Sequence, residues 1–194
     1  MLTPNDSVLA ALSGGADSVL MLRLLCRYRD QFGLEIRAAH VNHRLRGDES
    51  NRDEEFCKKL CDELSVPLFV KHENIAETAK QSGEGIEECG RRVRYDFFND
   101  CAKGAKIATA HNLDDRMETF VMNTIRGTSL NGLCSISPVR DNIIRPLIEC
   151  TKSDIVAYCE RMGYEYVTDS TNLSSTSCLQ CSILIQGNGR SSLH

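Results

Sequence analysis

The stretch "VLAALSGGADSVLMLRLL", Val8 to Leu25, joins two apolar runs through a short polar turn. The first run is brief and is followed by glycines, which predicts a buried strand over Ser7–Leu12. The second run is apolar on most sides and long enough to predict a helix over Ser18–Arg29, packed on a sheet. Between the two runs stands the turn Ser13-Gly14-Gly15-Ala16-Asp17-Ser18. The stretch therefore predicts a strand–turn–helix unit whose polar groups gather in the turn.

The composition of the turn suits the oxygens of a phosphate chain. Gly14 and Gly15 let the backbone turn tightly and expose its N–H groups, and the start of the helix adds more of them. Ser13 and Ser18 can add hydroxyl donors, and Asp17 makes sense beside phosphates if it holds a bridging divalent cation. The turn is neither a Walker A loop nor a G-x-G-x-x-G motif. The alternative is a tight turn with an ordinary helix N-cap.

Predicted strands and helices alternate along the rest of the chain. Further strands are expected over 35–41, 66–70 and 106–110, with a short strand-like segment over 164–167. Further helices are expected over 49–64, 85–101, 113–126 and 152–162. This alternation predicts the α/β class: an open, mainly parallel sheet with helices on both faces. Ligands of such sheets lie beyond the carboxyl ends of the strands, where Ser13–Ser18 is expected.

Composition restricts the class of protein and its compartment. The 194 residues are 41% hydrophobic and 26% charged with a net charge of −4, which suits a globular domain and argues against an overall basic nucleic-acid binder. No apolar run reaches the ~18 residues of a membrane span, and the start "MLTPNDS" lacks the features of a signal peptide. We therefore expect a cytoplasmic protein whose ten scattered cysteines are free, buried thiols.

Two polar segments are expected near the same edge of the sheet. The first follows the second strand and carries His40, Asn42, His43, Arg44 and Arg46. This segment is either a polar, partly cationic edge of a site beside the turn Ser13–Ser18 or a solvated loop. Taken alone, His40 is expected to be a histidine packed in the protein interior. In the second, "EECGRRVRYDFF" (87–98), Arg91 and Arg94 share one helical face, where they can grip phosphate or nucleic acid. A solvated helix surface is the alternative there.

The segment "ATAHNLDDRMETF" (108–120) places a histidine and three acids after the fourth strand. His111 stands at the carboxyl end of that strand, and Asp114 and Asp115 precede Glu118 by four and three positions. A helix that starts here directs its carboxylates back toward the strand ends. Such acids can share Mg²⁺ with Asp17 or neutralise a substrate amine. The alternative is the ordinary preference for acids at a helix start.

These segments carry a family resemblance. Ser-Gly-Gly-x-Asp-Ser after a first strand resembles the pyrophosphate-binding loop of the N-type ATP pyrophosphatases, the PP-loop superfamily. Four more segments resemble one family within it, tRNA(Ile)-lysidine synthetase: "HVNHRLRG" (40–47), "EECGRRVRY" (87–95), "HNLDDRMET" (111–119) with "RG" (126–127), and "RPLIE" (145–149) with "DSTN" (169–172). Asn112, Arg116 and Met117 depart from the family's residues. The resemblance implies an adenine nucleotide α-hydrolase-like fold.

The resemblance also implies an activity: ATP-dependent ligation of L-lysine to C2 of the wobble cytidine of tRNA(Ile) with a CAU anticodon, through an adenylated cytidine. ATP and Mg²⁺ are the implied cofactors, with Asp17 as the metal ligand. The implied nucleotide-binding residues are Ala11, Ser13, Gly14, Gly15, Ala16, Asp17, Ser18 and His40. The implied catalytic residues are Asp17, Arg91, Arg94, Asp114, Asp115 and Glu118. No membrane partner is implied, and a homodimer is left open.

The end of the chain departs from the family pattern. Residues 1–172 are expected to form the PP-loop catalytic domain, and 173–194 a divergent, poorly ordered tail in place of the family's C-terminal tRNA-binding domain. The tail lacks the family's Arg-Asn pair and is interpreted as a frameshifted or truncated end. The spacing of Cys178 and Cys181 suits zinc or redox chemistry but is interpreted as chance. Two alternatives stay open: an ATP-binding fragment without activity, and another PP-loop tRNA-modifying enzyme such as a thiolase.

Overall fold

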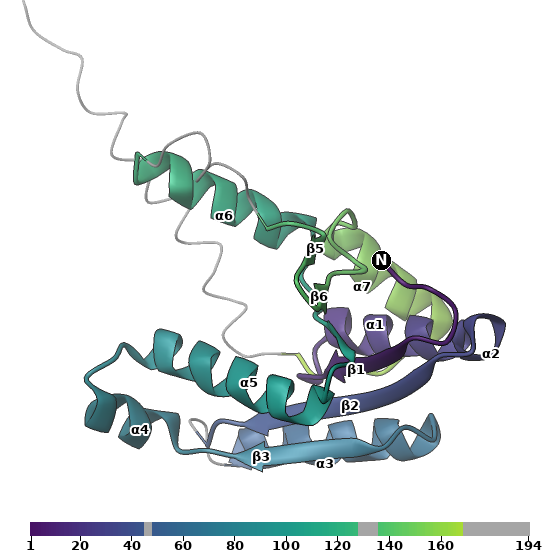
Figure 1. The fold of residues 1–194 in the computed structure, drawn as a ribbon, viewed down its shortest axis with the longest axis horizontal. Helices are drawn as coiled ribbons and strands as arrows, with labels where there is room; N and C mark the ends of the chain where they lie inside the picture. The colour runs from purple at the N-terminus through teal and green to yellow at the C-terminus, as the bar shows by residue number, and fades with distance from the viewer. Residues whose placement is uncertain (45–47, 128–135, 169–194) are drawn as a thin grey trace, which may run out of the picture.

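The computed structural model describes residues 1–44, 48–127 and 136–168 (Figure 1). In these residues one six-stranded sheet has the order β3-β2-β1-β4-β6-β5. Its strands are β1 Ser7–Ala11, β2 Glu35–Asn42, β3 Leu68–His72, β4 Lys106–Ala108, β5 Val139–Arg140 and β6 Ile143–Ile144. Neighbouring strands run parallel except at the edge, where β5 pairs antiparallel with β6. The predicted open, mainly parallel sheet is confirmed.

Helices cover both faces of this sheet. Within the described ranges they are α1 Ala16–Arg27, α2 Arg29–Phe32, α3 Asp48–Glu63, α4 Ile75–Ser82, α5 Ile86–Ala102, α6 Leu113–Ile125 and α7 Lys152–Met162. Because side chains alternate along a strand, β1 directs Val8 and Ala10 to one face and Leu9 to the other. Val8 and Ala10 pack in a core with residues of α1, α3 and α7, whereas Leu9 packs in a second core with residues of α4 and α5.

The N-termini of three helices meet at the carboxyl ends of the central strands. α1 follows β1 through the polar turn, and α6 begins a few residues after β4. α7 is joined to both: the Leu113 N–H of α6 donates to the Cys150 carbonyl at 2.8 Å, and Lys152 at the start of α7 contacts Asp17 of α1. The positive ends of three helix dipoles therefore point into one region, which favours bound anions there.

Helix α6 projects from the body of the domain (Figure 1). None of its 13 residues is buried. Met117, Phe120, Met122 and Ile125 are among the exposed large apolar side chains of the described residues. Only the first turn of α6 is therefore placed to act at the strand ends, and that turn carries Asp114 and Asp115.

The structure differs from the sequence-based expectations in several local details. Residues 164–167 form no strand; instead the Val167 N–H donates to the carbonyl of Gly14 at 2.9 Å, so this segment braces the polar turn. Helix α1 begins at Ala16 rather than at Ser18, and β3 lies two residues later than predicted because Pro67 has no N–H to give to the ladder. The short elements α2, α4, β5 and β6 were not predicted, because few residues carry their periodicity.

Two expectations from the composition, free cysteines and the lack of a membrane span, can be compared with the described residues. The described cysteines are all free, and four of them are buried: Cys57, Cys61, Cys89 and Cys159. No helix in residues 1–44, 48–127 and 136–168 is long and apolar enough to cross a membrane. The tail from residue 173, with Cys178 and Cys181, lies outside the described residues, as does the "DSTN" segment.

Candidate active site

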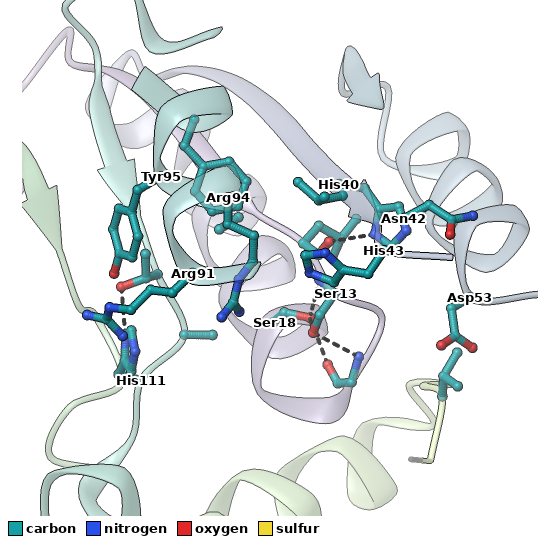
Figure 2. Close-up of a pocket in the computed structure, with 18 of the residues that line it drawn as sticks. Ser13, Ser18, His40, Asn42, His43, Asp53, Arg91, Arg94, Tyr95 and His111 are labelled. Atoms are coloured by element: carbon teal, nitrogen blue, oxygen red, sulfur yellow. Dashed lines mark hydrogen bonds between the residues drawn. The ribbon is translucent and has the colours of Figure 1, made fainter. Parts of the chain in front are cut away.

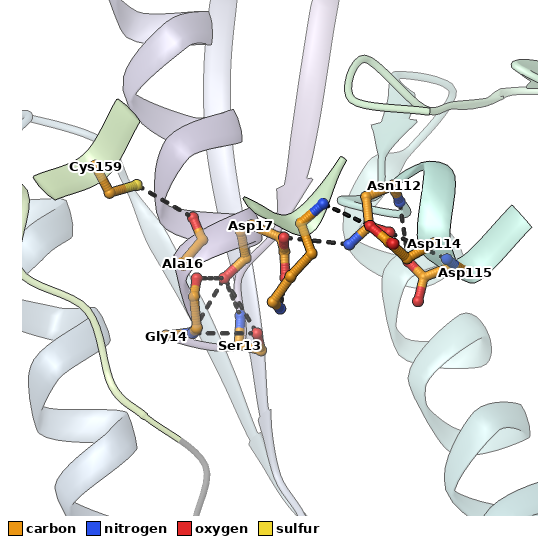
Figure 3. Close-up of polar contacts among 11 residues, drawn as sticks. Ser13, Gly14, Ala16, Asp17, Asn112, Asp114, Asp115 and Cys159 are labelled. Atoms are coloured by element: carbon orange, nitrogen blue, oxygen red, sulfur yellow. Dashed lines mark hydrogen bonds and ion pairs between the residues drawn. The ribbon is translucent and has the colours of Figure 1, made fainter. Parts of the chain in front are cut away.

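The polar turn after β1 is organised by one hydroxyl. The Ser18 Oγ accepts the backbone N–H groups of Ser13 and Gly14, each at 3.2 Å, and donates to the Gly15 carbonyl at 3.0 Å. The Ser13 Oγ lies 3.1 Å from the Ser18 Oγ (Figures 2 and 3). The turn is thus shaped before any ligand binds, which reduces the entropy lost when phosphate oxygens are bound.

Gly14 is the residue that this turn requires. Its φ of +97° lies in the left-handed region, which side chains other than glycine rarely adopt. A Cβ there would stand 3.4 Å from Val167 Cγ2 and 3.5 Å from Cys57 Sγ, because the chain after α7 and helix α3 close over this side of the turn. The glycine therefore serves both the turn and its packing against α3 and the segment after α7.

A cavity of about 400 Å³ opens beside the turn. Eight of the residues proposed from the sequence line it, namely Ala11, Ser13, Gly15, Ser18, His40, Arg91, Arg94 and Asp115 (Figure 2). Gly14, Ala16, Asp17, Asp114 and Glu118 are not part of this lining. The structure therefore brings the two arginines of α5 and one acid of α6 to the cavity beside the turn, whereas the other acids proposed from the sequence lie outside its lining.

Asp17 is engaged with side chains from two other helices. Its Oδ2 binds the ammonium of Lys152, and its Oδ1 accepts the amide N–H of Asn112 at 3.3 Å (Figure 3). The Lys152 backbone N–H donates to Asp114 Oδ2 at 2.5 Å. Glu118 is exposed, one turn further along α6. Lys152, which the sequence analysis did not single out, therefore joins two of the acids that it did.

These contacts bear on the predicted Mg²⁺. Within residues 1–44, 48–127 and 136–168, no group of three His, Cys, Asp or Glu side chains is arranged to hold a metal. Nucleotide sites commonly hold Mg²⁺ through one or two carboxylates and the phosphates themselves. Asp17 is the carboxylate of the turn that would hold such an ion, in exchange for Lys152, and the ion would neutralise phosphate charge there.

Two arginines of α5, Arg91 and Arg94, line one side of the cavity. Arg94 donates its Nε–H to the Gly90 carbonyl at 3.3 Å, and the Arg91 guanidinium lies over the Tyr95 ring with 5.1 Å to the centroid. Neither arginine forms an ion pair with a carboxylate of the described residues. Burial lowers the pKa of Arg94 from its usual value. A guanidinium that lines a cavity and has no carboxylate partner among the described residues is well suited to a bound anion.

Two histidines after β2 take different roles. Burial lowers the pKa of His40, so its neutral ring has an Nδ1–H that donates to the Leu12 carbonyl at 2.9 Å, next to the turn. The pKa of His43 falls to about 4 because of burial first, and then because of the positive charge of Arg94. The Nδ1 of His43 is buried and has no hydrogen-bond partner among the described residues. His40 thus braces the turn, and His43 presents a neutral ring to the cavity.

A buried acid that the sequence did not reveal fixes the end of β2. Burial alone would raise the pKa of Glu54, but hydrogen bonds from Asn42, Lys58 and His72 outweigh burial and bring the pKa to about 2. The Asn42 Nδ2–H donates to Glu54 Oε2 at 2.8 Å, and the His72 Nε2 lies 2.7 Å from the same oxygen. Glu54 lies within an acid-rich helix start, and nothing in its spacing distinguishes it from its exposed neighbours.

Comparison with known proteins places the chain in a class. Residues 3–177 match the PP-loop domain family, and the chain belongs to that family. It is 42% identical over 177 residues to the tRNA(Ile)-lysidine synthase of Clostridium acetobutylicum, covering 89% of this chain and 38% of the relative. It is 42% identical over 176 residues to the enzyme of the same name from Bacteroides thetaiotaomicron, covering 89% of this chain and 40% of that protein. The chain thus spans about two-fifths of the length of these relatives.

Solved structures confirm the fold. The U34-tRNA thiolase NcsA from Methanococcus maripaludis superposes with a TM-score of 0.73 at 23% identity, covering 97% of this chain and 69% of the thiolase. The NH3-dependent NAD synthetase of Campylobacter jejuni superposes with a TM-score of 0.56 at 16% identity, covering 95% of this chain and 79% of that one. The predicted adenine nucleotide α-hydrolase-like architecture is therefore confirmed.

Proposed function

We propose that this chain carries the catalytic chemistry of lysidine formation: ATP-dependent ligation of L-lysine to C2 of the wobble cytidine in tRNA(Ile). The observation that carries the proposal is the preformed turn of Ser13–Ser18, which opens on a cavity that Arg91, Arg94 and Asp115 also line. The identity of 42% to enzymes named tRNA(Ile)-lysidine synthase supports this choice among PP-loop reactions.

In the first step, ATP binds with its β- and γ-phosphates on the turn and its α-phosphate toward the cavity. The N–H groups at the start of α1 neutralise the pyrophosphate, and Lys152 lies close enough to assist them. Arg91 and Arg94 approach from α5 and balance the charge that develops at the α-phosphorus. The C2 oxygen of cytidine attacks that phosphorus and pyrophosphate leaves, which gives an adenylated base. Catalysis here is positioning plus charge neutralisation.

In the second step, the ε-amine of lysine attacks C2 and AMP leaves. Asp115 lines the cavity and supplies the negative charge that attracts the amino group of the substrate. Its side chain is held in place by a capping box: Asp115 Oδ2 accepts the Asn112 N–H at 2.9 Å, and Asn112 Oδ1 accepts the Asp115 N–H at 3.0 Å. We assign Asp114 and Glu118 supporting roles around the same amine.

The proposal also covers the domain organisation of the chain, its binding partners and its compartment. Residues 1–172 form the PP-loop catalytic domain, and 173–194 a divergent tail. The partners are tRNA(Ile) with a CAU anticodon, free L-lysine, ATP with Mg²⁺, and a second copy of the chain in a homodimer. The setting is the cytoplasm.

The test is incorporation of radiolabelled lysine into tRNA(Ile) by the whole 194-residue chain. Label must appear in tRNA only when ATP is present, and pyrophosphate must be released in step with it. A chain that binds Mg·ATP in a calorimeter yet transfers no lysine is the ATP-binding fragment instead. Transfer of sulfur rather than lysine to tRNA identifies a thiolase, the class to which the NcsA structure belongs.

A further inference from the structure

We propose that His111 is the general base of the lysine-transfer step, the group that takes a proton from the incoming ε-ammonium of lysine. This inference rests on the proposed function and names a catalytic residue within it. His111 lines the cavity together with the two arginines of α5 (Figure 2), and Asp115 lines the same cavity.

The ring of His111 is anchored to the sheet through one of its nitrogens. Its Nδ1 lies 3.0 Å from the Thr109 Oγ1. Thr109 is only 5% exposed, and its backbone N–H donates to the Ile144 carbonyl of β6 at 2.9 Å. The proposal assigns the tautomer in which Nδ1–H donates to the threonine hydroxyl. That tautomer leaves the Nε2 lone pair free to accept a proton.

The charges around His111 favour its neutral form. Burial lowers its pKa; Asp115 of α6 acts in the opposite direction, and Arg145, Arg91 and Arg94 lower the pKa further. The net result is a pKa below the usual value for histidine, so the ring is unprotonated at neutral pH. A lysine amine enters this site as an ammonium and must lose a proton before it can attack. Asp115 is placed to attract that ammonium, and His111 to accept its proton.

The step balances as follows. One proton passes from the ε-ammonium to His111 Nε2, and the nitrogen lone pair that this frees forms the N–C2 bond. The C2–O bond then breaks, and its electron pair leaves with the oxygen as AMP. Of the two protons left on the attacking nitrogen, one passes to the phosphate of the departing AMP or to water and the other stays on the nitrogen, so the product is a guanidinium-like cation. The protonated His111 returns its proton to water.

The variant His111→Asn separates the two half-reactions. We expect adenylation, measured as label from [α-³²P]ATP on tRNA without lysine, to stay within about threefold of the unsubstituted chain. Lysine transfer should fall by about 10²-fold or more, the usual effect of losing a general base. An analogue of lysine with an aminooxy group in place of the ε-amine is unprotonated at neutral pH, so it should react equally well with both chains.

Three results would overturn the assignment: unchanged lysine transfer in the variant, loss of adenylation alongside transfer, or failure of the aminooxy analogue to restore transfer. If the unsubstituted chain makes no lysidine at all, the proposed function fails instead. In that case ¹⁵N NMR of the histidine rings still measures which nitrogen of His111 carries a proton. An unprotonated Nε2 at pH 7 supports the proposal, and a protonated Nε2 contradicts it.

Discussion

Lys152 places its ammonium against the carboxylate of Asp17, which lies 135 positions earlier in the chain. The same residue donates its backbone N–H to Asp114. One lysine at the start of α7 therefore ties the turn Ser13–Ser18 to the acidic start of α6. Asp17, predicted from the sequence as a metal ligand, is in this structure the partner of a cation from the protein itself.

Replacing Asp17 tests what this contact does. Asp17→Asn keeps the shape of the side chain but removes its charge, so Lys152 loses its ion-pair partner and the proposed Mg²⁺ would lose its carboxylate. We expect ATP turnover to fall by about 10²-fold. The free energy of unfolding should change by less than about 1 kcal/mol, because the Lys152 side chain is 45% exposed and the pair is screened by solvent.

Pyrophosphate release and urea titration measure these two effects for Asp17→Asn. The exposed Asp30 of α2 offers a matched control, since Asp30→Asn removes the same charge far from the turn. Unchanged turnover in Asp17→Asn would remove Asp17 from the machinery.

Gly14→Ala tests the shape of the turn. The left-handed φ of +97° costs an alanine about 1–2 kcal/mol, and the added Cβ meets Val167 and Cys57. We expect lower stability together with at least a tenfold loss of ATP affinity. Gly83→Ala is the control: it carries the same kind of strain at φ +72°, but its Cβ meets open space and lies at the end of α4. Calorimetry with Mg·ATP should show the loss of affinity in Gly14→Ala alone.

Arg94→Met tests the anion-binding side of the cavity. Because Arg94 is exposed and has no carboxylate partner among the described residues, its removal should change the free energy of unfolding by less than about 1 kcal/mol, while adenylation falls by about 10²-fold. Arg92 is two positions away on the same helix, and it pairs with Glu84 at the surface. Arg92→Met should therefore leave adenylation within about twofold. Equal losses in the two variants would point to a general effect on α5 rather than to an anion site.

Glu54→Gln tests the brace at the end of β2 through its pH dependence. The folded-state pKa of about 2 lies below the unfolded value, so the carboxylate stabilises the fold above the unfolded pKa and loses that effect as pH falls toward 2. We expect the variant to be less stable by about 2 kcal/mol at pH 7. The difference between the two proteins should shrink steadily below about pH 4.5. A difference in unfolding free energy that is constant from pH 7 to pH 3 would contradict this role for Glu54.

Most of the framework follows from local sequence. The apolar runs around Ser13–Ser18 predict β1 and α1, and the alternation of periods 2 and 3.6 predicts the parallel sheet and its covering helices. The positions of Arg91 and Arg94 on one face of α5 also follow from helical spacing. The short β5–β6 pair and the loop character of residues 164–167 do not, because such short segments carry no periodicity and depend on the contacts that surround them.

The sequence by itself therefore determined the α/β scaffold, the glycine-bearing turn and the edge of the sheet at which chemistry gathers. Only the tertiary structure decided the partners: Lys152 on Asp17, Thr109 behind His111, and Glu54 on Asn42. The physical reason is that periodicity reports the face of an element on which a residue lies. It does not report which side chain from another element meets that residue, and two of these three contacts join residues from different elements.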